Sequence, residues 1–101
     1  MVSGGGDEMT IEDYADIVNV YLIIRRYCNQ DNRYSAEFEN AEIKEGGCLA
    51  GVYGNGKTAT EAVLNYVEQI RGKRIVFDAF GKNRREFDVP NTLVAGGVYD
   101  E

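Results

Sequence analysis

The sequence predicts an α+β fold: a mainly antiparallel sheet of four or five strands in the order β-β-β-α-β-β, with one main helix packed on one face. Three observations predict it. Apolar and polar residues alternate in several short runs, turn-forming residues separate these runs, and a single stretch shows strong helical periodicity. Short turns favour antiparallel pairing, because a parallel pair of strands needs a long crossover connection.

The chain of 101 residues is expected to form one domain over residues 10–90. Residues 1–9 contain a run of glycines and are expected to be a disordered tail. Residues 91–101 show little pattern and are expected to be a weakly structured acidic tail.

The first half of the chain is expected to form a short helical turn followed by three strands. Thr10 to Asp13 fits a loose capping box, which favours a turn of helix to about residue 15. Alternation over 18–27 predicts the first strand, and a cluster of turn formers follows it. The second strand, over 33–44, changes phase near Asn40, where we expect a bulge. After Gly46 and Gly47 a third strand is expected over 48–53, and then a loop over 54–56.

The second half begins with the predicted main helix, Thr58–Arg71. Thr58 and Glu61 form a capping box, and Gly72 is placed to end the helix. Its apolar residues follow one helical face: Ala62, Val63, Tyr66, Val67 and Ile70. Strands are expected over 74–79 and 84–89, closed by Pro90.

Composition excludes several classes of function. Asp and Glu number 17 against 11 Lys and Arg, which gives a net charge of -6 and a pI near 4.6. Direct nucleic-acid binding is therefore not expected, because it needs cations to offset phosphate charge. The chain has no histidine, so we expect neither the common histidine-based catalysis nor most zinc sites, and predict no enzyme activity, metal or cofactor.

The expected cellular setting follows from hydropathy and cysteine content. No apolar run is long enough to cross a bilayer, and no membrane association is expected. Cys28 and Cys48 are expected to be reduced and partly buried thiols in a cytoplasmic protein.

Residues 51–58 match the nucleotide-binding pattern G-x-x-x-x-G-K-[ST]. A hydrolase of that class needs a parallel sheet, so the antiparallel prediction disfavours it. A second interpretation is a binder of a small phosphorylated ligand, such as a signalling nucleotide, held at a helix N-terminus. The residues for that site are Asn55, Gly56, Lys57, Thr58, Arg84 and Arg85.

The leading hypothesis is a non-catalytic module that binds a basic protein through an acidic surface. The candidate contact residues are Glu37, Glu39, Glu42 and Tyr27. Tyr14 is also expected to be exposed, whereas Tyr21, Tyr34, Tyr53 and Tyr66 are expected in the core. A homo-oligomer is compatible with the same composition.

The stretch from Tyr21 to Val76 resembles the HicB-like antitoxin domain. The resemblance rests on strands, a Gly54-Asn-Gly56 loop and a helix that opens with Thr58-Ala-Thr-Glu61-Ala62. HicB-like antitoxins commonly carry a C-terminal DNA-binding domain, and this sequence has a further hairpin instead. The chain is also similar to small phage proteins of unassigned role. The resemblance implies partner binding in the host cytoplasm, such as inhibition of a nuclease or defence protein.

Overall fold

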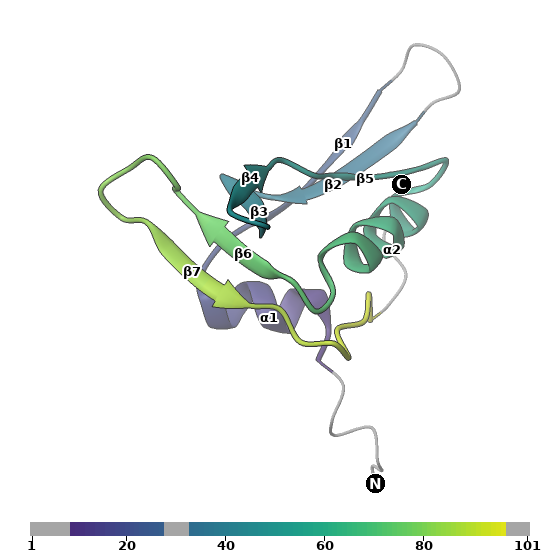
Figure 1. The fold of residues 1–101 in the computed structure, drawn as a ribbon. Coiled ribbons are helices and arrows are strands. Elements are labelled where there is room, and N and C mark those ends of the chain that lie inside the picture. Colours follow the sequence, from purple (N-terminus) through teal and green to yellow (C-terminus); the bar gives the residue numbers. More distant parts are fainter. Residues whose placement is uncertain (1–8, 28–32, 97–101) are drawn as a thin grey trace, which may run out of the picture.

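The computed structural model describes residues 9–27 and 33–96, and it shows an α+β fold with two helices and two antiparallel sheets (Figure 1). The helices are α1 (Ile11–Val18) and α2 (Ala59–Ile70). The strands are β1 (Leu22–Arg26), β2 (Tyr34–Phe38), β3 (Ala41–Glu45), β4 (Cys48–Ala50), β5 (Gly54–Gly56), β6 (Arg74–Phe77) and β7 (Arg85–Asp88). This confirms the predicted fold class.

The strands form two sheets rather than the single sheet that was expected. One has the order β1-β2-β5 and the other β4-β3-β6-β7, and every pair of neighbours is antiparallel. The phase change at Asn40 is the reason. Asn40 adopts a left-handed backbone with φ 56°, so the chain turns a corner there and passes from one sheet into the other. The expected bulge is therefore a junction between sheets.

Helix α1 is longer than the turn that was expected. The Thr10 hydroxyl accepts the Asp13 N–H at 3.0 Å, and the helix ends at Asn19 with φ 60°. Val18 was expected to begin the first strand, but it is the last residue of this helix and is buried in the core. The first strand therefore begins at Leu22.

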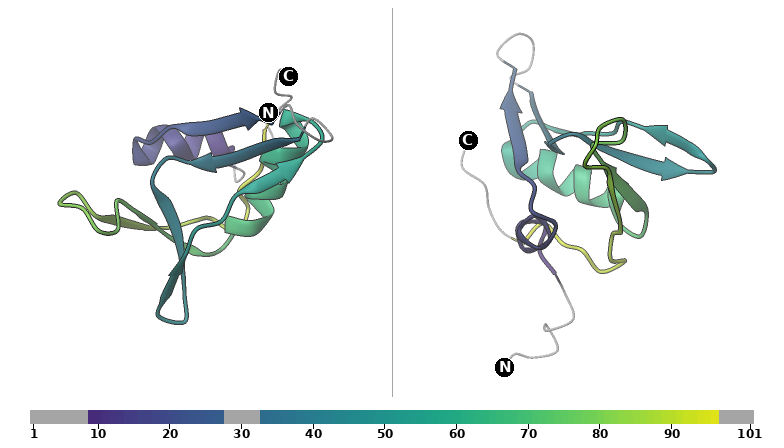
Figure 2. Two further views of the ribbon diagram at one scale, coloured as in Figure 1. Left: turned by 90° about the horizontal axis from the view of Figure 1, so that it is seen from above. Right: turned by 90° about the vertical axis from the view of Figure 1, so that its left-hand side faces the viewer.

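Helix α2 lies where the sequence predicts it and packs on the sheet that contains β2 and β5 (Figure 2). Residues 54–56 were expected to be a loop, but they form strand β5, which pairs with β2 directly under the helix. Glycine permits that approach, because a Cβ on Gly54 would lie 2.1 Å from the Ala62 carbonyl oxygen. These glycines therefore serve helix packing.

The core is centred on Phe38, whose ring contacts Tyr14, Tyr66 and Phe77. Residues 91–96, expected to belong to a loose tail, close one side of this core. Leu93 and Ala95 are buried, and Thr10 forms a parallel bridge with Val94. Leu93, Val94 and Ala95 form a short apolar run without strand or helix periodicity, so this packing could not be predicted from the sequence.

Several surface assignments also differ from expectation. Tyr34 and Tyr66 are buried as expected, but Tyr14 is buried, and Tyr21 and Tyr53 are exposed. Cys48 is exposed rather than partly buried, and Cys28 lies outside the described residues. Neither helix of the described chain has the length and apolar character that a membrane crossing requires.

Candidate partner-binding groove

Three adjoining hollows follow the junction where the two sheets and α1 meet. The largest has a volume of about 410 Å³ and is lined by Asn40, Ala41, Glu42, Asp78, Ala79, Phe80 and Gly81. A second, of about 230 Å³, shares Asn40 and Asp78 with it. A third, of about 280 Å³, shares Asn19, Val20 and Tyr21 with the second. We call these three neighbouring hollows together, from Phe80 to Asp16, the corner groove.

Backbone turns shape the corner groove. Among the described residues, the non-glycine residues with positive φ are Asn19 (60°), Asn40 (56°) and Asp78 (53°), and all three line the groove. Asn and Asp tolerate this conformation better than other side chains. The Asp78 N–H donates to the Asn40 carbonyl at 3.0 Å, so two of these turns are tied together. The walls are thus set by the ends of α1, β2 and β6.

Two large aromatic side chains project at the groove. Phe80 is 90% exposed and Tyr21 is 75% exposed. Ile17, next to the groove residue Asp16, is also exposed. Exposed apolar side chains that gather along one depression are typical of interaction sites.

The charged side chains that line the groove are mainly acidic. Asp16, Glu39, Glu42 and Asp78 line it, and none of them forms an ion pair with another described residue. One Glu42 oxygen, Oε1, is buried without a hydrogen-bond partner among the described residues.

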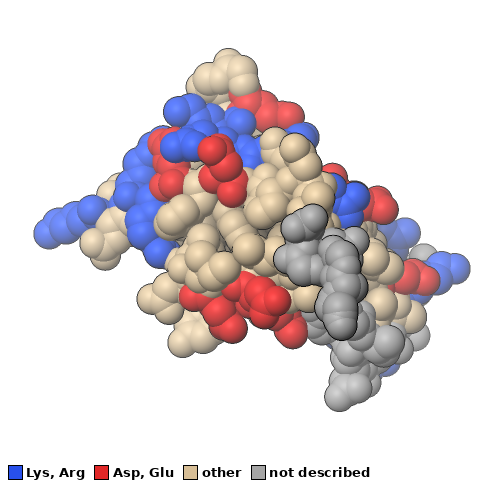
Figure 3. Space-filling model, turned by 90° about the horizontal axis from the view of Figure 1, so that it is seen from below, with Lys and Arg blue, Asp and Glu red and all other residues tan. Residues whose placement is uncertain are grey.

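Arg85, the cation that lines the groove, contacts other groups of the chain. Its guanidinium donates to the Val18 carbonyl and lies over the rings of Phe77 and Phe87 at 5.5 and 5.7 Å. The exposed acidic residues of α1, Glu12, Asp13 and Asp16, extend the negative character beside the groove. Figure 3 views the molecule from the α1 side and shows an acidic patch apart from the Lys- and Arg-rich area.

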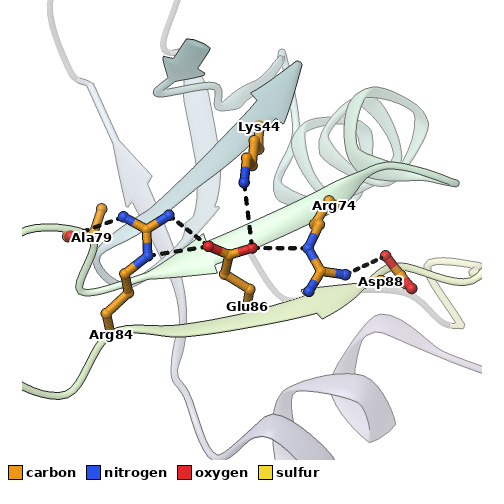
Figure 4. Close-up of polar contacts among 6 residues, drawn as sticks. All are labelled: Lys44, Arg74, Ala79, Arg84, Glu86 and Asp88. Carbon is orange, nitrogen blue, oxygen red and sulfur yellow. Dashed lines mark hydrogen bonds and ion pairs between the residues drawn. The ribbon is translucent and has the colours of Figure 1, made fainter. Parts of the chain in front are cut away.

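A contrasting arrangement occupies the surface of the four-stranded sheet (Figure 4). Glu86 accepts hydrogen bonds from Arg74 at 2.8 Å and from Arg84 at 2.5 Å, and Lys44 lies 3.7 Å away. These hydrogen bonds, first that of Arg74 and then that of Arg84, lower the pKa of Glu86 from 4.5 to about 2. Arg74 also binds Asp88 at 2.8 Å.

The predicted acidic contact residues do not form one surface. Glu39 and Glu42 lie in the corner groove. Glu37 instead pairs with Arg25 across β1 and β2 at 2.7 Å. Tyr27 is 45% exposed, but it lies at the other end of β1 from Tyr21, with its hydroxyl 3.5 Å from the Ser35 hydroxyl.

The predicted phosphate-site residues lie in two separate places. Arg33, Asn55, Gly56, Lys57 and Glu61 line a hollow of about 480 Å³. The Lys57 N–H there donates to the Glu61 carboxylate at 2.9 Å, and the Thr58 hydroxyl accepts the Glu61 N–H at 3.1 Å.

The remaining predicted residues, Arg84 and Arg85, belong to the β6–β7 hairpin at the opposite end of the molecule (Figure 1). Arg84 is bonded to Glu86 and to the Ala79 carbonyl at 3.2 Å. Both the helix start and the hairpin arginines are thus engaged by groups of the chain itself.

Phe80, Asp78 and Asn40 are among the groove residues that sequence reasoning missed. The phase change at Asn40 was a usable signal, although it was assigned to a bulge, and Phe80 is an aromatic residue placed in a polar turn.

Within residues 9–27 and 33–96 no group of three or more acidic or cysteine side chains is placed to hold a metal ion. Comparison with protein-family models, curated proteins and solved structures gave no match.

Proposed function

We propose that this protein is a non-catalytic binding module and that the corner groove docks a basic segment of another protein. The observation that carries the proposal is the combination of exposed aromatic side chains with carboxylates that have no cation inside the described chain. A basic segment supplies the missing charges, and the aliphatic stems of its side chains can cover Phe80 and Tyr21.

The free-energy terms favour such a partner. Glu42 Oε1 is buried and has no hydrogen-bond partner among the described residues, so a cationic donor of the partner would give this oxygen a favourable contact. Phe80 offers a ring face to a Lys or Arg side chain, an attraction of about 0.5–1 kcal/mol at exposed sites. The net charge of -6 adds attraction at longer range.

An inhibitory role toward a nuclease or defence protein of the host cell fits this chemistry. Proteins that act on nucleic acids present basic surfaces to phosphate, and an acidic groove is complementary to such a surface. The HicB-like resemblance stays a prediction. Its support is the order of strands, helix and strand over residues 21–76.

The alternative, binding of a small phosphorylated ligand, has weaker support. The hollow beside Lys57 contains two cations, Arg33 and Lys57, but also the carboxylate of Glu61. Glu61 already accepts the hydrogen bond of the Lys57 N–H that a phosphate would need. A phosphate must therefore displace an internal carboxylate.

Selection from random peptides tests the proposal and does not require that the natural partner be identified. A displayed peptide library is selected on the immobilised protein and, in parallel, on Glu39→Lys and Glu68→Lys variants. Glu68 is exposed on α2 and forms no ion pair with another described residue, so it is a matched control.

The expected result is enrichment of peptides rich in Lys and Arg that bind the parent and the Glu68→Lys variant but bind the Glu39→Lys variant more weakly. Enrichment of acidic or uncharged peptides, or equal binding to all three proteins, contradicts the proposal. Enrichment of acidic peptides whose binding is lost only in a Lys57→Ala variant favours an anion site beside Lys57, as the phosphate alternative predicts.

A further inference from the structure

The two sheets have four edge strands, and they differ in what covers their outward backbone groups. At β7 the Tyr14 hydroxyl donates to the Asp88 carbonyl at 3.2 Å. At β5 the Asn55 N–H donates to the Asn65 side chain at 3.0 Å. Strand β4 has three residues and offers little edge. The fourth edge, β1, has five residues without proline.

The ladder of β1 shows which of its groups point outward. The Tyr21 carbonyl accepts the Glu39 N–H at 2.9 Å, and the Tyr27 N–H donates to the Arg33 carbonyl at 2.7 Å. Alternate residues of an antiparallel strand bond to the same neighbour, so residues 21, 23, 25 and 27 bond to β2.

The N–H and C=O groups of Leu22, Ile24 and Arg26 therefore face away from the sheet. None of these groups has a hydrogen bond to another described residue. Strand β1 forms an outer margin of the described ribbon in both views of Figure 2. Such an edge is a template for an added strand.

The outward backbone groups and the exposed tyrosines along this edge are placed symmetrically about Ile24, whereas the side chains of Leu22 and Arg26 differ. The outward residues Leu22 and Arg26 lie two positions on either side of it. The exposed tyrosines, Tyr21 and Tyr27, lie three positions on either side. A twofold axis at Ile24 therefore places every outward N–H opposite an outward C=O, and each Tyr21 opposite Tyr27 of the second copy.

The charged residues of β1 are compatible with antiparallel pairing of two copies. Arg25 comes opposite Ile23, and Arg26 comes opposite Leu22, so no like charges are directly opposed. Aromatic residues directly opposite each other in antiparallel strands stabilise the pair by roughly 0.2–1 kcal/mol. The net charge of -6 on each copy opposes association, but salt screens exposed charges beyond about 8 Å at physiological ionic strength.

We propose that two copies of this chain pair through β1, antiparallel and with the twofold axis at Ile24, to form one six-stranded sheet. This dimer does not require a groove partner, but it covers Tyr21, which also lines the corner groove. It buries Tyr21 of one copy against Tyr27 of the other, and it accounts for the two exposed tyrosines that flank β1.

Sedimentation equilibrium of the pure protein over a broad dilution series tests the proposal. The mass is expected to rise from 11.3 kDa to twice that value with concentration. Arg26→Pro removes an outward N–H and leaves the β1–β2 ladder intact, so the dissociation constant should rise at least about tenfold. Arg26→Ala, which keeps that N–H, is the matched control and should dimerise like the parent.

Hydrogen exchange on the unsubstituted protein provides a readout that does not depend on any variant folding. The Leu22, Ile24 and Arg26 amides should be protected at high concentration and lose that protection on dilution. A monomer at all concentrations overturns the proposal. So does a dimer in which these amides stay unprotected, or one that Arg26→Pro and Arg26→Ala leave equally strong.

Discussion

Glu86 and the corner groove are two acidic regions that differ in what balances their charge. Around Glu86, three cations of the same chain lie within ion-pair distance, and two of them hydrogen-bond to it. In the groove, carboxylates from α1, the β2–β3 turn, β3 and the turn after β6 have no ion-pair partner among the described residues.

The difference separates regions whose charged and polar groups find partners among the described residues from a region whose carboxylates do not. The Glu86 network and the packing of α2 on β5 satisfy their own polar groups and close contacts. The groove keeps a buried Glu42 oxygen that has no hydrogen-bond partner among the described residues, and an almost fully exposed Phe80. Substitutions in the Glu86 network or at the contact of α2 with β5 should therefore change stability, and substitutions in the groove should change binding.

The largest effect is expected for Gly54→Ala. The new methyl group would meet the Ala62 carbonyl at 2.1 Å and the Tyr66 backbone N at 2.5 Å, so α2 must move away from β5. We expect a loss of about 3 kcal/mol in the free energy of unfolding, measured by urea denaturation. Gly51→Ala, where nothing lies within 4 Å, is the control and should be nearly neutral. Equal effects at both positions would contradict the packing described for β5.

A smaller loss is expected for Tyr66→Phe. The Tyr66 hydroxyl accepts the buried Phe38 N–H at 3.1 Å, and its removal leaves that donor without a partner. The cost should be about 1–3 kcal/mol in unfolding free energy. Tyr21→Phe, at an exposed ring, should change stability by less than about 0.5 kcal/mol. A neutral Tyr66→Phe would show that this hydroxyl is not structurally required.

Charge reversal at the groove should affect binding rather than stability. Glu39→Lys is expected to weaken binding of a selected basic peptide by about 1 kcal/mol, or roughly fivefold in Kd, and to reduce its salt dependence. Calorimetric titration at two salt concentrations measures both. An unchanged Kd with unchanged salt dependence would place the peptide elsewhere.

The smallest effect is expected for acid stability at Glu86. Its pKa falls from 4.5 to about 2 on folding, so its contribution to stability is present above pH 4.5 and is lost as the pH falls toward 2. Glu86→Gln should make the decline of unfolding free energy over this range shallower. Urea denaturation across the range measures it, with Glu12→Gln as the exposed control. Identical slopes in parent and Glu86→Gln would contradict the network.

The sequence predicted the elements whose signals are local. The capping box of Thr58 and Glu61 defined the start of α2, and alternation defined β6 and β7. Competing patterns were harder to separate. Val18 fits an alternating strand and also the apolar face of α1. In the structure it is the last residue of the helix and is buried in the core.

Long-range relations could not be predicted in the same way. Glycines have low strand propensity, so β5 became apparent only from its place under α2. Of the groove, Glu39 and Glu42 were singled out from the sequence, whereas Phe80 and Asp78 were not. Their side chains join those glutamates only because Asn40 turns the chain between two sheets.

The most direct test of the central claim is to map where a selected basic peptide binds. Titration of the ¹⁵N-labelled protein should shift the backbone amides of Asn19, Asn40, Asp78 and Phe80 most strongly, because these residues line the corner groove. The amides of Lys57 and Glu86 should shift little. Largest shifts around Lys57, or shifts spread evenly over the surface, would contradict the claim that the groove is the docking site.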